Sequence, residues 1–407
     1  MTGLQLCVVC AVSSEPIALT GAITPFELLL TCEGKKFRAQ VLHTPHGKAL
    51  PSQCFTLAKI DLNEVDALRE AFINGRSTTA DHDRIKQLGS QLFKTAFSGE
   101  VRESFLQSLA IAQFMRTALK VRLRVESDDL SMLPWEMMFC VEGGGFLTTS
   151  QQVTFTRFTW TGCPTAQRKV TNFPLVILIH VCDDPGGEAS KLQAKREVSL
   201  IRKALGPLLT NRSVAIRTTS GGTWDALKSA LDKEGTRVDV LHIIGHGDMQ
   251  GAEGVILMGA TPVNATTLAT RLQQSGISLA VLNTCKGAMG RTTDALAGIA
   301  QKLVRTAIPS VVAMQFSISD DAAIAFSSEF YGSLAKRAPL DLAVTRARIN
   351  MVGLNSFEWM TPVLYDTNPD AVPFALPPSR PKKFRKKIPI SKAAEVYYRD
   401  RNRRLDL

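Results

Sequence analysis

Two side chains that could act together in nucleophilic chemistry each follow an apolar segment of the chain. His246 lies between two glycines directly after the segment 238–244, and Cys285 follows the segment 278–283. A thiol attacks as its thiolate, and an imidazole is well suited to take up the proton near neutral pH. The imidazole can then return the proton to a leaving amine, and water can hydrolyse the acyl-enzyme that remains. The pair therefore predicts thiol-dependent acyl transfer.

The segments around these residues predict the elements that would bring them together. From residue 173 onward, apolar runs alternate with amphipathic ones. Runs that are apolar along their whole length, separated by amphipathic helices, are typical of a parallel sheet covered on both faces. Strands are expected at 175–180, 213–219, 238–244, 278–283 and 310–314, and helices at 188–205, 223–233, 266–274 and 293–306.

This pattern predicts a doubly wound α/β fold. One crossover connection joins parallel strands, and the carboxyl ends of such strands meet at one edge of the sheet. His246 and Cys285, which are 39 residues apart, should therefore lie at the same edge.

The chain is expected to divide into four regions. These are an N-terminal α/β region (1–125), a connecting segment with the motif LPWE (126–170), a catalytic domain (171–377) and a basic tail (378–407). Trp135 in the LPWE motif is interpreted as a packing anchor, since burial of the indole is the commoner use of a tryptophan beside proline.

Residues beside the pair suggest supporting roles. Gly247 removes side-chain bulk next to His246, so the backbone N–H groups of Gly247 and Cys285 are the candidate donors to an oxyanion. Asp248, Asn283 and Arg157 are candidate substrate-pocket residues, although Asp248 could equally tie a loop.

Other chemistries fit the sequence less well. His242 and His246 are four residues apart, but their segment is β-branched and extended, and no third ligand or catalytic glutamate is evident. The segment 286–293 lacks the Gly-Lys-Ser/Thr ending of a phosphate loop. We therefore expect neither a metal nor an organic cofactor.

Composition and charge limit the class of protein. Of 407 residues, 45% are hydrophobic, and no run approaches the roughly 20 apolar residues of a membrane span. The eight cysteines are scattered rather than spaced as a disulfide framework, so a reducing cytoplasm is the expected compartment. The net charge is +11, but residues 380–407 hold 11 basic and 3 acidic residues, which leaves only +3 for the rest of the chain.

Several motifs resemble those of one family. LHIIGHGD at 241–248 and LNTCKGA at 282–288 are similar to the two catalytic motifs of CHAT proteases, which belong to the caspase and separase group. The resemblance covers about 88–373 and includes LPWE, 308–335, LDLAVTRAR at 340–348 and WMTPVLY at 359–365.

The resemblance implies a caspase-like fold, with Cys285 as nucleophile, His246 as general base and acid, and an oxyanion held by the amides of Gly247 and Cys285. It implies a cysteine endopeptidase without cofactor that stays latent as a zymogen until a sensor protein or ligand activates it. Similar prokaryotic proteases act in antiviral defence or programmed cell death on a protein partner such as a gasdermin.

Two alternatives remain open. The chain could be a catalytically idle interaction module of the same fold. It could also bind nucleic acid, membrane lipid or an acidic partner through the tail, whose charge suits an anionic surface.

Overall fold

The computed structural model describes residues 25–34, 36–47, 50–57, 60, 63–65, 67–68, 81–161, 173–183, 188–233, 237–250, 253–285, 293–306, 308–316, 318–354, 357–368, 372, 374 and 376. For residues 188–192, 249, 284–285 and 293–297 it describes the backbone alone. The chain divides into two units, 1–375 and 376–407, and every element below belongs to the first. Within the described ranges, no helix is long and apolar enough to span a membrane.

The strands that carry the candidate residues are parallel, as the sequence predicted. β10 (Val240–Gln250) lies between β8 (Leu175–Val181) and β13 (Leu279–Cys285) and runs parallel to both. The parallel set continues from β13 to β14 (Ser310–Met314) and from β8 to β9 (Val214–Thr218). The fully apolar runs form buried strands because helices cover both faces. The predicted fold class is confirmed.

The strand with His246 is longer than the sequence predicted. Beyond residue 245, β10 pairs antiparallel with β11 (Glu253–Met258), which in turn pairs with β12 (Thr261–Asn264). This hairpin supplies hydrogen-bond partners to the backbone of the Gly-His-Gly segment. His246 therefore lies inside a strand and not in a loop after it.

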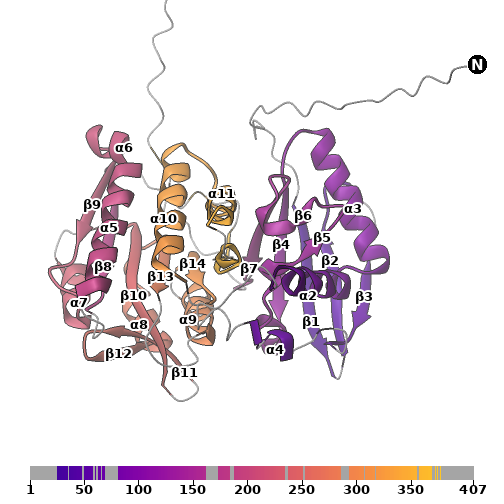
Figure 1. The fold of residues 1–407 in the computed structure, drawn as a ribbon, viewed down its shortest axis with the longest axis horizontal. Helices are drawn as coiled ribbons and strands as arrows, with labels where there is room; N and C mark the ends of the chain where they lie inside the picture. Colours follow the sequence, from indigo (N-terminus) through magenta and orange to yellow (C-terminus); the bar gives the residue numbers. More distant parts are fainter. Residues whose placement is uncertain are drawn as a thin grey trace, which may run out of the picture. The chain divides into compact units, whose positions relative to one another are not determined.

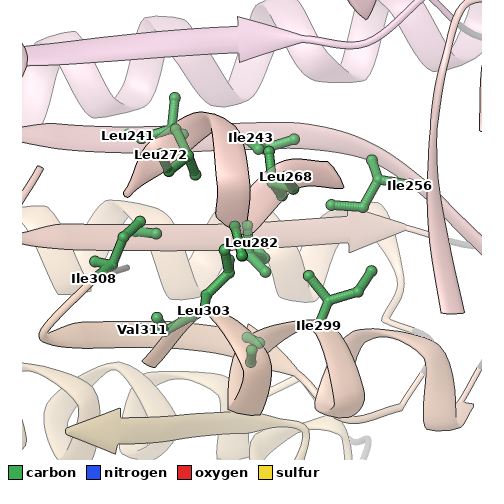
Figure 2. Close-up of a cluster of buried hydrophobic side chains, with 14 of the residues drawn as sticks. Leu241, Ile243, Ile256, Leu268, Leu272, Leu282, Ile299, Leu303, Ile308 and Val311 are labelled. Atoms are coloured by element: carbon green, nitrogen blue, oxygen red, sulfur yellow. The ribbon is translucent and has the colours of Figure 1, made fainter. Parts of the chain in front are cut away.

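A hydrophobic core fills one face of the parallel strands (Figure 2). Leu241 and Ile243 of β10 and Leu282 of β13 pack there against three helices. These helices are α7 (Trp224–Asp232), α8 (Ala265–Leu272) and α9 (Thr293–Thr306).

Other helices cover the opposite face. α5 (Glu188–Ala204) and α10 (Asp320–Ala335) run alongside each other there, as Figure 1 shows, and α11 (Leu340–Val352) packs on α10. The start of α10 follows from its sequence, because Ser319 is an N-cap whose hydroxyl accepts a hydrogen bond from the Ala322 N–H.

The sheet extends without a break into the N-terminal half of the chain. β15 (Pro362–Asp366) pairs antiparallel with β14 and parallel with β7 (Val153–Phe158). From β7 the sheet continues through β4 (Leu119–Glu126), β1 (Phe26–Glu33), β2 (Lys36–His43) and β3 (Ser52–Phe55). The strand order is β12-β11-β10-β13-β14-β15-β7-β4-β1-β2-β3, with β8 and β9 branching from β10. Within this sheet, β7 from the predicted connecting segment pairs with strands of both halves, and the division of the chain into four regions stays a prediction.

Most of the remaining elements lie in the N-terminal half of the chain. The remaining elements are α2 (Asp81–Ala96), α3 (Gly99–Phe114), α4 (Asp128–Ser131), η2 (Trp135–Met137), β5 (Phe139–Cys140), β6 (Gly145–Phe146), η3 (Leu147–Thr149), α6 (Gly206–Thr210) and η4 (Glu358–Met360). A buried cluster of Phe26, Phe93, Phe97 and Phe105 packs α2 and α3 against β1.

Candidate active site

The sheet places His246 and Cys285 directly beside each other. They are Cα partners in the parallel pairing of β10 with β13, and Cys285 is the last residue of its strand. Neighbouring strands lie about 4.8 Å apart. The backbone therefore brings a histidine and a cysteine to adjacent positions at the carboxyl edge of the sheet.

Close packing fixes the path of the backbone just before His246. A Cβ at Gly245 would lie 2.7 Å from Sγ and 2.8 Å from Cβ of Cys182, which follows β8. Since real Cβ atoms do not approach so closely, only glycine fits at this position. Gly247 is buried opposite Ile256 of β11, and its role as an oxyanion donor stays a prediction.

The candidate pocket residues occupy different environments. Asp248 is partly buried in the part of β10 that pairs with β11. Asn283 is fully buried two residues before Cys285, and its side chain donates to Glu197 rather than facing solvent. Arg157 lies on β7, four strands from β10 in the sheet, or about 19 Å at the usual strand spacing. The structure therefore keeps only Asp248 as an accessible candidate near the pair.

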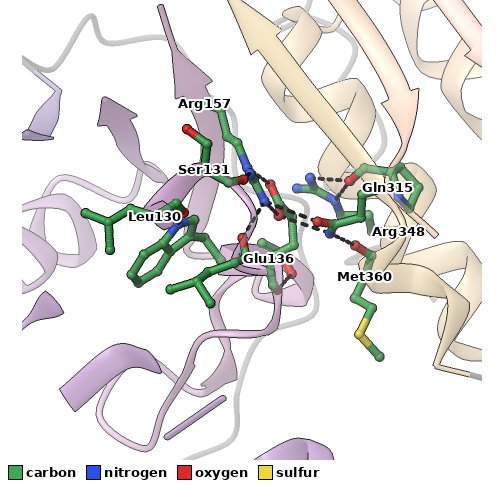
Figure 3. A network of polar contacts seen from close by, with 11 residues as sticks. Leu130, Ser131, Glu136, Arg157, Gln315, Arg348 and Met360 are labelled. Carbon is green, nitrogen blue, oxygen red and sulfur yellow. Dashed lines mark hydrogen bonds and ion pairs between the residues drawn. The ribbon is translucent and has the colours of Figure 1, made fainter. Parts of the chain in front are cut away.

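Arg157 instead belongs to a buried contact between the two halves of the sheet (Figure 3). Its Nε donates to Glu136 Oε1 at 3.0 Å, and its Nη1 donates to the carbonyl of Ser131 at 2.9 Å. Gln315, directly after β14, accepts from Arg157 Nη2 at 3.2 Å and donates to Glu136 Oε2 at 3.1 Å. The LPWE glutamate thus ties β7 to the end of β14.

Trp135 of the same motif is an anchor, as predicted. Its side chain is fully buried, and its indole N–H donates to the carbonyl of Leu130 at 2.7 Å.

A second buried polar cluster lies beneath the His–Cys pair. The carboxylate of Glu197 on α5 accepts hydrogen bonds at 2.6 Å from Asn283 Nδ2 and from Ser327 Oγ. His242 Nε2 lies 3.3 Å from the same oxygen, a close contact without hydrogen-bond alignment. On its other side, His242 Nδ1 lies 3.0 Å from the Tyr331 hydroxyl. Burial, followed by the charge of Glu197, raises the pKa of Tyr331, so this phenol is neutral.

Possible metal ligands do not cluster in the described part of the chain. No group of three or more His, Cys, Asp or Glu side chains lies there close enough to share an ion. The expectation that the site works without a metal or cofactor stays a prediction.

The sheet and its edge define an α/β protein with a histidine and a cysteine side by side at the carboxyl ends of parallel strands. The family model of the CHAT domain matches residues 86–381. The chain therefore belongs to the CHAT domain family. A search of curated proteins found no match.

A separase and a cysteine proteinase are among the solved structures that resemble the chain. One is separase in the Saccharomyces cerevisiae separase–securin complex, with a TM-score of 0.49 and 13% identity over 84% of this chain and 30% of that chain. The other is the Arg specific cysteine proteinase gingipain R, with a TM-score of 0.42 and 11% identity over 70% of this chain and 73% of that chain. The match thus spans less than a third of the separase chain.

Sequence reasoning missed Glu197, which the structure places at the centre of the buried cluster. A signal was available. Ala194, Ile201 and Leu205 are buried at helical spacing, and Glu197 falls on the same stripe. A carboxylate in an apolar stripe must find partners inside the fold.

Proposed function

We propose that this CHAT protein is a cysteine endopeptidase. The observation that supports the proposal is the register of β10 and β13, which makes His246 and Cys285 neighbours. A general base must come within hydrogen-bond reach of its nucleophile, directly or through one water. The two residues occupy adjacent backbone positions at one edge of the sheet, which supports such an approach of their side chains. The match to the CHAT family is consistent with the proposal.

In the proposed reaction, the Cys285 thiolate attacks the carbonyl carbon of a peptide bond while protonated His246 stays beside it. The C–N bond then breaks, and the imidazolium gives its proton to the leaving amine. Water attacks the thioester while neutral His246 takes up one of its protons, and the C–S bond then breaks, which releases the carboxylic acid and restores the Cys285 thiolate beside protonated His246. The amides of Gly247 and Cys285 are the proposed donors to the oxyanion of each tetrahedral intermediate.

The substrate and the mode of control are also proposals. We infer a protein substrate such as a gasdermin-like effector, and an activating sensor protein or ligand, in a cytoplasmic setting of antiviral defence or programmed cell death. The charge of +8 on residues 380–407 favours contact of the tail with an anionic surface, which high salt would weaken.

The test compares the wild-type chain with Cys285→Ala and His246→Ala. Each protein is incubated with candidate protein substrates and activators, and fragments are identified by mass spectrometry. We expect a fragment with a new amino terminus from the wild type only, with cleavage reduced about 10³-fold or more in either variant. Equal cleavage by Cys285→Ala would contradict the proposal and favour an idle interaction module.

A further inference from the structure

The buried cluster beneath the pair connects the two strands that carry it. His242 precedes His246 on β10 by four residues, and Asn283 precedes Cys285 on β13 by two. Side chains at even spacing along a strand lie on one face of the sheet. Positions 242 and 283 are therefore on the same face as positions 246 and 285, close to the catalytic edge.

One carboxylate joins these strands to two helices. Glu197 comes from α5, and the Asn283 and Ser327 groups that donate to it come from β13 and α10. His242 of β10 contacts the same Glu197 oxygen and also Tyr331 of α10. Four elements thus meet at a single side chain that is 2% exposed.

Stability alone does not account for such a cluster. Removing a carboxylate from water costs several kcal/mol, and apolar replacements of buried ionic groups are often neutral or stabilising. The adjacent core face shows that this sheet readily packs with apolar side chains. A buried, hydrogen-bonded carboxylate fixes the geometry of its surroundings, because each hydrogen bond constrains both the distance and the angle between donor and acceptor.

We propose that Glu197 is a positioning residue for the His246–Cys285 pair. It acts through Asn283 on β13 and through His242 on β10, holding the two strand tips in the register that keeps the imidazole beside the thiol. This inference rests on the proposed function, because it assumes that the pair works as a thiolate and an imidazolium.

The experiment measures alkylation of Cys285 by iodoacetamide at pH 6.5 and pH 9.5 on the full chain. Peptide mass spectrometry follows Cys285 separately from the other cysteines, and no substrate or activator is needed. A neighbouring imidazolium favours the thiolate most at low pH. In Glu197→Gln we therefore expect alkylation to slow about tenfold at pH 6.5 and to change little at pH 9.5.

Companion variants separate positioning from folding. Asn283→Ala removes the link to β13 and should show the same pH-selective loss of alkylation. It therefore tests the inference even if Glu197→Gln fails to fold. Asp366→Asn is the matched control, because it also replaces a buried carboxyl by an amide. Asp366 pairs with Ser310, the first residue of β14, and so lies at the other edge of the sheet from the His246–Cys285 pair. Its alkylation should match the wild type at both pH values.

The outcomes distinguish this inference from the proposed function. Wild-type rates in folded Glu197→Gln and Asn283→Ala, or a loss that is equal at both pH values, would overturn the positioning role. If His246→Ala also leaves the alkylation of Cys285 unchanged, the proposed function itself fails. If only His246→Ala slows alkylation at pH 6.5, the pair stands and Glu197 has no part in it.

Discussion

At the scale of single residues, the contact between Gly245 and Cys182 controls how β10 reaches the edge of the sheet where His246 lies. The Cβ of Cys182, which follows β8, would lie only 2.8 Å from a Cβ at position 245. The backbone of β10 therefore comes so close to Cys182 that only glycine fits at position 245. His246 is the next residue, and its backbone position depends on this approach.

Gly245→Ala should therefore destabilise the protein. Overpacking a tight site costs about 1–3 kcal/mol, and we expect that loss in urea unfolding together with slower cleavage. Adding Cys182→Gly, which removes both clashing atoms, should recover part of the loss. Gly298→Ala is the control, because nothing lies within 4 Å of a Cβ at this exposed position of α9, and it should be neutral or stabilising. Equal effects of both alanine variants would refute the packing argument.

At the scale of elements, Glu136 and Arg157 hold β7 and β14 in one sheet. The register between β15 and β7 is short, with Tyr365 and Asp366 opposite Arg157 and Phe158. Because so few backbone pairs join β15 to β7, the junction between the two halves of the sheet depends on side-chain contacts. The buried ion pair, extended by Gln315 to the carbonyl of Met360, supplies the connection.

Glu136→Gln should weaken this junction strongly. Arg157 would remain buried without its counter-charge, which typically costs about 3–5 kcal/mol in unfolding free energy. The double variant Glu136→Gln with Arg157→Met removes both charges and should be more stable than Glu136→Gln alone. A double-mutant cycle by urea unfolding measures the coupling. Additive losses in the two single variants would show that the pair does not act as a unit.

At the scale of the whole molecule, two buried groups give opposite dependences of stability on pH. Burial raises the pKa of Asp366 to about 7, so the folded chain keeps a proton that the unfolded chain loses above its ordinary pKa of 3.8. Burial lowers the pKa of His180 to about 4. Between pH 6.5 and 4, His180 is therefore protonated in the unfolded chain and neutral in the folded chain. Between pH 4 and 6.5, the Asp366 contribution to stability falls as pH rises, while the His180 contribution rises.

Single substitutions should separate the two contributions. Asp366→Asn removes the Asp366 contribution. The stability of this variant relative to the wild type should therefore increase as the pH rises from 4 to 7, by at most about 4 kcal/mol. His180→Gln removes the second, so its stability relative to wild type should increase as pH falls from 6.5 to 4. Urea unfolding at a series of pH values measures both differences. A difference that does not vary with pH would show that the group titrates alike in the folded and unfolded chains.

The sequence by itself determined the alternation of elements and predicted that His246 and Cys285 act as a pair. The run 310–314, which is apolar after Ser310, was predicted as a buried strand, and the boundaries of β14 agree with the prediction. Parallel strands joined by one crossover then required His246 and Cys285 to share an edge, because chain direction and strand ends are local properties. The CHAT motifs added the family, which the match over residues 86–381 shows.

Only the tertiary structure decided what surrounds that pair. Burial and hydrogen bonding depend on contacts between segments far apart in the chain, and no local pattern fixes them. Asn283 and Arg157 were interpreted as substrate-pocket candidates from type and proximity, but the fold turns them toward Glu197 and Glu136. Likewise, the hairpin of β10 with β11 and the pairing of β7 with β15 depend on which strands become neighbours when the sheet assembles.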